Sequence, residues 1–70
     1  MVDHYHVIAG GITSTWFEPK KTFEFAEEIN APLVEAYDES DNLVYRYFRN
    51  CLGGWTEYKA GESPVQRRKN

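Results

Sequence analysis

The N-terminal part of the chain contains two short runs of residues that are typical of β-strands. The runs are residues 4–9 and 12–17, and Gly10-Gly11 lies between them. Two glycines can both take positive φ, so this pattern predicts a tight β-hairpin that pairs Ala9 with Ile12. In that register the face that we expect to be the core carries Tyr5, Val7, Ala9, Ile12 and Trp16. The other face carries His4, His6, Thr13 and Thr15, with Ile8 and Phe17 as its only large apolar residues.

A single amphipathic helix is predicted next, over residues 19–30. Pro19 suits the first helical position after Glu18, and Thr22 is a later alternative start. Helical spacing predicts a stripe that faces the sheet, formed by Thr22, Phe25, Ala26 and Ile29. Asn30, with Pro32 two residues later, ends the helix.

A second hairpin is predicted from residues 33–37 and 43–48, around a polar turn at residues 38–42. We expect Asp38 to pair with Leu43. This register places Glu35 opposite Arg46, and their opposite charges support it. The face toward the helix would carry Val34, Ala36, Leu43, Tyr45 and Tyr47. The other face would carry Leu33, Tyr37, Val44 and Phe48 beside the Glu35–Arg46 pair.

The last part of the chain predicts one further strand and a tail. Gly53-Gly54 indicates a turn, after which residues 55–59 can add a short edge strand. Residues 61–70 are polar and end with Arg67-Arg68-Lys69, so we expect a flexible basic tail there.

The predicted fold class is α+β, in one compact domain over residues 1–60. Two antiparallel hairpins, with a fifth edge strand as an option, form a small sheet covered by one helix in the order ββαββ(β). A chain of 70 residues, 41% hydrophobic and 27% charged, has room for one small core and is too apolar for wholesale disorder. One helix covers only one face of a sheet, so the other face should stay open.

The sequence predicts a cytoplasmic protein. Cys51 is the single cysteine, whereas a small secreted domain normally carries several. We expect no signal peptide, because residues 1–4 show no basic region followed by an apolar run. No apolar stretch approaches the roughly 20 residues of a membrane span, so we expect no membrane association.

The chemistry-bearing residues do not form a catalytic or metal-binding pattern. His4 and His6 share a strand face, but a metal site needs three or four ligands, and only Asp3 and the distant Cys51 remain. We expect both histidines to be exposed. Cys51 lacks an orienting group and an oxyanion site, and neither glycine pair precedes the lysine or helix start of a phosphate loop. We therefore expect no enzyme activity, no metal and no cofactor.

Charge and aromatic residues instead favour a binding role. Residues 1–42 carry two lysines against nine acidic residues, whereas residues 43–70 carry six basic residues against two acidic ones. Eleven of the 70 residues are aromatic, more than one small core can cover. Aromatic residues beside arginines are enriched at protein interfaces, and they also stack on nucleic-acid bases.

Two candidate surfaces follow from the predicted faces. The partner-binding surface comprises Leu33, Glu35, Tyr37, Val44, Arg46, Phe48, Arg49, Trp55 and Tyr58. The acidic surface, which would complement a basic partner, comprises Glu24, Glu27, Glu28, Asp38, Glu39 and Asp41. These carboxylates could also imitate nucleic-acid phosphates, although a solvated helix face and a polar turn are the simpler interpretation.

The run Phe25-Ala26-Glu27-Glu28-Ile29-Asn30-Ala31-Pro32-Leu33-Val34-Glu35-Ala36-Tyr37-Asp38, followed by Asp41-Asn42-Leu43-Val44-Tyr45, resembles a known helix–strand–turn–strand unit. This unit recurs in very small phage-encoded and bacterial proteins, including coliphage inhibitors of host RNA polymerase. The resemblance covers about a third of the chain. It implies a compact α+β protein that binds and inhibits or redirects a host protein, and it assigns no residue a role.

The leading interpretation is a non-enzymatic, phage-type module that binds a host protein, such as transcription or defence machinery, through the open face. It would act in the host-cell cytoplasm as a monomer or homodimer. The alternative is a small protein that binds single-stranded nucleic acid or RNA. In that case Phe48, Trp55 and Tyr58 would stack on bases, and the basic tail would meet phosphates. The net charge of −3 weighs against this alternative, because affinity for nucleic acid is largely electrostatic.

Overall fold

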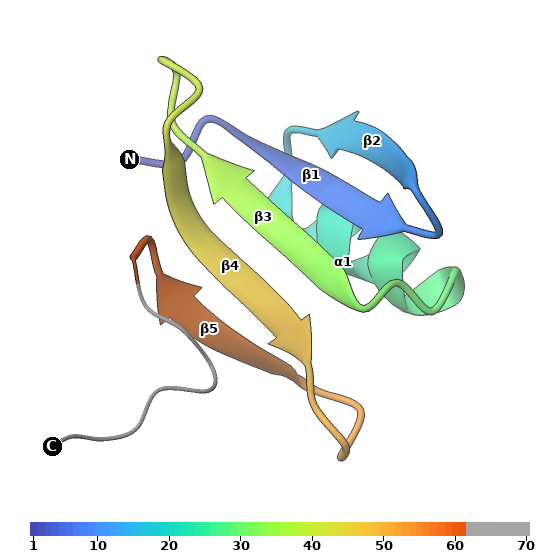
Figure 1. The fold of residues 1–70 in the computed structure, drawn as a ribbon. Helices are drawn as coiled ribbons and strands as arrows, with labels where there is room; N and C mark the ends of the chain where they lie inside the picture. Colours follow the sequence, from blue (N-terminus) through green and yellow to red (C-terminus); the bar gives the residue numbers. More distant parts are fainter. Residues whose placement is uncertain (62–70) are drawn as a thin grey trace, which may run out of the picture.

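The computed structural model describes residues 1–61, which form one helix packed on one antiparallel sheet (Figure 1). In chain order the elements are β1 (His4–Ala9), β2 (Ile12–Trp16), α1 (Pro19–Glu28), β3 (Leu33–Tyr37), β4 (Leu43–Arg49) and β5 (Trp55–Lys59). The five strands lie across the sheet in the order β2-β1-β3-β4-β5. The fold is therefore α+β with the predicted element order, and the fifth strand is present. The tail predicted over residues 61–70 lies outside the described residues, apart from Gly61.

The first hairpin has the predicted turn and register. Gly10 and Gly11 have φ values of 57° and 82°, and Ala9 pairs with Ile12. Ile12 was expected to be in the core, but it is 73% exposed. The reason is that β2 is an edge strand and Ile12 is its first residue after the turn, so within residues 1–61 no strand covers its outer side.

The helix begins where the sequence indicates and ends two residues before the predicted end. Pro19 occupies its first turn, and the Glu18 carbonyl accepts hydrogen bonds from the Thr22 N–H at 2.9 Å and the Thr22 hydroxyl at 2.6 Å. Asn30 has φ 61°, the left-handed conformation that commonly ends a helix. The N–H of Ala31 then donates to the Ala26 carbonyl at 2.8 Å.

The helix face that packs on the sheet differs in part from the predicted stripe. Thr22 and Ala26 are buried as predicted, and Phe25 is half-buried. Ile29 is 43% exposed, contrary to the prediction. The chain leaves the helical path at Ile29, and Ala31 is buried nearby instead.

Phe23, which the predicted stripe omitted, connects α1 to the far half of the sheet. The backbone of α1 packs against β1, β2 and β3, and among the described residues it does not reach β4 or β5 (Figure 1). The Phe23 ring lies 5.0 Å from the Tyr47 ring and 5.3 Å from the Trp55 ring. Trp55 also donates its Nε1 hydrogen to Glu27 on α1 at 3.2 Å. Side chains therefore span the gap that the helix backbone leaves.

The second hairpin confirms the predicted central register and contains one irregularity. Glu35 lies opposite Arg46, but Tyr37 rather than Asp38 pairs with Leu43, because a β-bulge interrupts the ladder between Ala36 and Tyr37. A shift of one residue moves a side chain to the other face, so Leu43 shares a face with Tyr37 instead of facing the helix as predicted. The Asp38 side chain instead orders the turn.

Asp38 stabilises this turn through two backbone hydrogen bonds. Its Oδ1 atom accepts from the N–H groups of Ser40 and Asn42, both at 2.9 Å. These bonds, with the one from Asn42 the largest cause, hold the pKa of Asp38 below its ordinary value. Asp41 follows in the left-handed conformation with φ 64°.

The core is small and consists mainly of short side chains. Its buried apolar members are Tyr5, Val7, Ala26, Ala31, Val34 and Ala36. Short side chains on both surfaces let the helix lie close to the sheet. Half-buried aromatic residues pack around them, namely Trp16, Phe23, Phe25, Tyr45, Tyr47 and Trp55. Tyr45 and Tyr47 thus face the helix side, as predicted, but they belong to this aromatic rim.

We expect Phe23→Ala to loosen β5, because Phe23 contacts Tyr47 and Trp55. The free energy of unfolding should fall by about 3 kcal/mol, the lower end of the range for truncating a packed Phe, because the ring is half-buried. Phe25→Ala is the matched control, since it makes the same change on the same helix but removes a contact with Trp16 on β2. Amide hydrogen exchange should quicken most in β5 for Phe23→Ala and most in β2 for Phe25→Ala. An identical exchange pattern in both variants would contradict this assignment.

Candidate interaction surface

The face of the sheet opposite α1, here called the open face, carries three rows of side chains that cross the strands. Residues paired across strands share a face, so the registers define each row. The first row consists of Thr13, Ile8, Leu33, Phe48 and Thr56. The second consists of Thr15, His6, Glu35, Arg46 and Tyr58. The third consists of His4, Tyr37 and Leu43.

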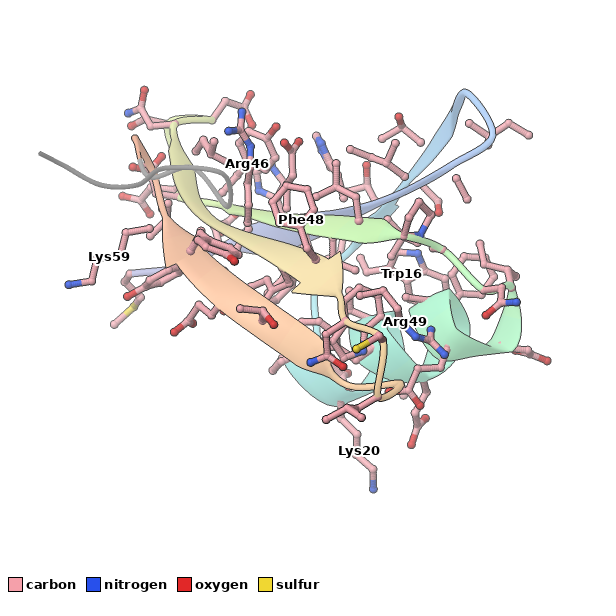
Figure 2. All side chains as sticks on the ribbon, turned by 60° about the horizontal axis from the view of Figure 1, so that its bottom comes forward. Trp16, Lys20, Arg46, Phe48, Arg49 and Lys59 are labelled. Atoms are coloured by element: carbon pink, nitrogen blue, oxygen red, sulfur yellow. The ribbon has the colours of Figure 1, made fainter. Side chains whose placement is uncertain are left out.

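The first row is an apolar strip across three adjacent strands. Ile8, Leu33 and Phe48 are direct cross-strand neighbours, and all three are half-buried. Phe48 also meets Tyr58 edge to face, with ring centroids 5.7 Å apart. Figure 2 shows Phe48 and Arg46 on the same side of β4, away from α1. The strip is continuous because the registers align one apolar residue from each of β1, β3 and β4.

A buried carboxylate occupies the centre of the second row. The Glu35 side chain is only 12% exposed, and its Oε2 atom accepts a hydrogen bond from Arg46 Nε at 3.1 Å. Its Oε1 atom accepts a hydrogen bond from the Tyr37 hydroxyl at 2.7 Å. A buried charge is costly unless it is paired and hydrogen-bonded, and both conditions are met here. This network holds Arg46 and Tyr37 in fixed positions on the open face.

The two histidines differ from their predicted exposure. His4 is 9% exposed, with Nδ1 2.8 Å from Asp3 Oδ2 and Nε2 3.0 Å from Asp41 Oδ1. Its ring stacks on Tyr37 at 5.6 Å and 8°, and the His6 ring lies 4.6 Å from the same tyrosine. Burial of His4 follows from the β3–β4 turn, which brings Asp41 over the end of β1. The prediction that both histidines are exposed is therefore wrong: His4 is buried and His6 is half-buried.

Arg49 and Trp55 were predicted to belong to the partner-binding surface, but the structure places them on the helix side. They are cross-strand partners, with the Arg49 guanidinium carbon 5.4 Å from the centre of the Trp55 ring. Trp55 packs on Phe23, as described above, and Figure 2 shows Arg49 on the side of α1. Strand alternation already separates Arg49 from Arg46, because residues three apart in a regular strand lie on opposite faces.

The remaining predicted partner-binding residues lie on the open face or at its margin. Leu33, Glu35, Tyr37, Arg46, Phe48 and Tyr58 belong to the three rows. Val44 lies at the β-bulge, where no residue of β3 is its register partner. Sequence reasoning left out Ile8 and His6, which sit beside Leu33 and Glu35. Their inclusion depends on the pairing of β1 with β3, which no local signal indicates.

The predicted acidic surface is divided between two places. Glu24, Glu27 and Glu28 lie on α1, before the start of β3, whereas Asp38, Glu39 and Asp41 follow its other end (Figure 1). Three of these carboxylates have intramolecular partners: Glu27 binds Trp55, Asp38 binds the turn backbone, and Asp41 contacts His4. A single acidic surface is therefore not formed.

No family model matches the sequence, and neither the curated proteins nor the solved structures gave a match. Within residues 1–61, no helix has the length and apolar character needed to cross a membrane. The same residues contain no group of three or more histidine, cysteine, aspartate or glutamate side chains placed to hold a metal ion. Function must therefore be inferred from the geometry of the open face.

The contact between Tyr37 and Glu35 predicts a loss of stability at alkaline pH. Burial, followed by the hydrogen bond to Glu35, raises the pKa of Tyr37 from 10.0 to about 12. The folded state favours the neutral phenol, so this contribution to the free energy of unfolding is complete below pH 10. It is lost as the pH rises from 10 toward 12.

Urea denaturation of the wild type and of Tyr37→Phe, which has no phenol at this position, tests this expectation. The variant should lose less stability across that alkaline range than the wild type. Tyr47, whose pKa is also raised by burial and by its hydrogen bond to Glu57, still contributes in both proteins. Equal losses in the two proteins would show that Tyr37 is not held as described.

Proposed function

We propose that this protein is a non-enzymatic module that binds another protein through its open face. The observation that supports this most is that a continuous apolar strip, Ile8–Leu33–Phe48, lies on a face over which no described element packs. Contiguous exposed apolar area that is bordered by polar residues is typical of interaction sites. Here the polar border is the row that contains Glu35 and Arg46.

The open face has the composition and size of a protein interface. Tyrosine and arginine are among the residue types enriched in the few positions that dominate binding energy, and Tyr37, Arg46 and Tyr58 lie beside the apolar strip. The two longer dimensions of the molecule are 38 and 30 Å. A face of these dimensions has an area on the order of 1,000 Å², which is comparable to the roughly 800 Å² that one partner buries in a standard interface.

The Glu35 network reduces the cost of using this surface. Ordering mobile side chains on association costs about 0.5–1.5 kcal/mol of binding free energy for each rotamer-rich side chain. Arg46 and Tyr37 are already held by Glu35, so binding need not order them anew. Arg46 nevertheless remains 42% exposed and can contact a partner.

The proposed partner is a host protein, in line with the resemblance of residues 25–45 to small phage-encoded proteins. Binding would inhibit or redirect that protein, for example a component of transcription or defence machinery. The exposed carboxylates of Glu24, Glu28 and Glu39 would favour a partner with basic residues around its binding site. Because they lie outside the open face, they would affect the rate of association more than the binding affinity.

The nucleic-acid alternative fits the arrangement of side chains less well. It requires Phe48, Tyr58 and Trp55 on one stacking surface, whereas Trp55 lies on the opposite side of the sheet. Arg46 is the basic residue within the three rows, and Glu35 neutralises it. The open face itself therefore lacks an unpaired arginine or lysine that would supply the electrostatic attraction behind most non-specific affinity for nucleic acid, and the basic residues 67–69 lie outside the described residues.

We expect Phe48→Ala and Arg46→Ala to weaken partner binding, each by about 1–3 kcal/mol of binding free energy. Phe48→Ala should leave the fold intact, whereas Arg46→Ala should also lower the melting temperature, because it leaves the buried Glu35 carboxylate without its charged partner. Tyr47→Ala is the control on the opposite face, where loss of contact with Phe23 should cost about 3 kcal/mol of unfolding free energy. The immobilised protein should first capture a partner from a bacterial lysate. Titration of that partner, beside thermal melting, then compares the three variants. A low melting temperature for Phe48→Ala with a benign Tyr47→Ala would show that the binding face is assigned to the wrong side.

Oligonucleotide binding separates the two candidate functions. Near physiological salt, we expect single-stranded DNA and RNA to bind negligibly in a fluorescence anisotropy titration. If nucleic acid were the ligand, affinity would fall steeply as salt rises, and neutralising Arg67, Arg68 and Lys69 would flatten that dependence. Binding with micromolar or tighter affinity would overturn the proposal.

A further inference from the structure

The two edges of the sheet differ in how they discourage pairing with other strands. Exposed edge strands present unpaired backbone groups, and proteins commonly protect them with charged residues, prolines or bulges. β5 carries Glu57 and Lys59, whereas β2 has the sequence Ile12-Thr13-Ser14-Thr15-Trp16, without charge or proline. Its pairing with β1 runs without a bulge. Within residues 1–61, the β2 edge is therefore open to a further strand.

The direction of the free backbone groups on β2 follows from its turn. The two-residue turn makes Ala9 and Ile12 a hydrogen-bonded pair, and such pairs alternate along an antiparallel ladder. The peptide groups of Ile12, Ser14 and Trp16 thus point toward β1. Those of Thr13 and Thr15 point away from the sheet, where an added strand would meet them.

We propose that β2 pairs with β2 of a second copy, antiparallel about a two-fold axis at Ser14, to give a homodimer with one continuous ten-stranded sheet. This register places Thr13 opposite Thr15 of the second copy, so that the outward backbone groups meet. Threonine–threonine pairs across strands are favourable. The same register places Ile12 opposite Trp16 of the second copy. The segment is self-complementary, as a two-fold interface requires.

Exposed apolar residues in β2 and directly after it support the same partner. Ile12 is 73% exposed and Phe17 is 68% exposed, although both are large hydrophobic residues. In the proposed register Phe17 lies opposite Gly11 of the second copy, and Gly11 has open space where a side chain would be. Both apolar residues would thus lose exposure on pairing. A five-residue edge buries less area than the roughly 1,200 Å² of the smallest standard interfaces, so the dimer should be weak and concentration-dependent.

Paired charge variants of the full chain test the register. Thr13→Lys combined with Thr15→Lys places lysine opposite lysine across the axis, and edge lysines also discourage strand pairing. Thr13→Lys combined with Thr15→Glu places lysine opposite glutamate at both positions. The two variants change the same two exposed sites, which lie on the open side of β2. Thr56→Lys on β5 is the control for the other edge.

Sedimentation equilibrium from about 10 μM to 1 mM, a range that covers weak association, should show a wild-type monomer–dimer equilibrium. The lysine–lysine variant should have a dissociation constant at least tenfold higher than the wild type, which is roughly the effect of two unfavourable cross-strand pairs. The lysine–glutamate variant and Thr56→Lys should dimerise like the wild type. A wild type that stays monomeric throughout would overturn the proposal, as would a folded lysine–lysine variant that still dimerises. If that variant fails to fold, the wild type itself decides the question. In a mixture of isotope-labelled and unlabelled protein, contacts between the Thr13 amide of one copy and the Thr15 amide of the other support the register. Their absence refutes it.

Discussion

The width of the sheet relative to a single helix is the constraint on which the rest of this structure depends. A helix of ten residues is about 15 Å long and about 10–12 Å wide with its side chains. Five strands spaced about 4.8 Å apart span roughly 20 Å. α1 therefore packs on β1, β2 and β3 and leaves one whole face of the sheet without a described covering element. The short side chains of the core, such as Ala26, Val34 and Ala36, follow from this geometry, because they let the helix lie close to the strands.

The aromatic residues compensate for the small helix, and this divides them between two roles. Phe23, Tyr47 and Trp55 extend the packed layer from α1 to β4 and β5, where the helix backbone does not reach. Tyr37, Phe48 and Tyr58 lie on the opposite side and contribute to the open face. Only this second group and the exposed Phe17 are surplus to the core, so the aromatic surface available to a partner on the open face is smaller than the composition suggests.

Several charged side chains of the described residues bind other side chains within the molecule. Glu35 binds Arg46 and Tyr37, Asp41 contacts His4, and Glu27 binds Trp55. In so small a domain, a buried charge without a partner would cost a large share of the total stability. These pairings also connect elements that are distant in sequence, and they fix the polar part of the open face. Within residues 1–61, the charges at the centre of the open face are thus paired within the molecule.

The local features of the fold could be predicted from the sequence, because each depends on neighbouring residues. Glycines at the first turn, a proline at the helix start and the opposite charges of Glu35 and Arg46 determine the two hairpins, the helix and the central register. The burial of His4 and the role of Phe23 could not be predicted in this way. Each depends on contacts between segments far apart in the chain, such as Asp41 with His4 or Phe23 with Trp55. The sequence by itself thus determined which segments become strands or helix, and which residues of each strand lie on the same face. Only the tertiary structure decided that β1 lies beside β3, and with it that Ile8, Leu33 and Phe48 form one strip, because strand order is set by packing of the whole sheet under one helix.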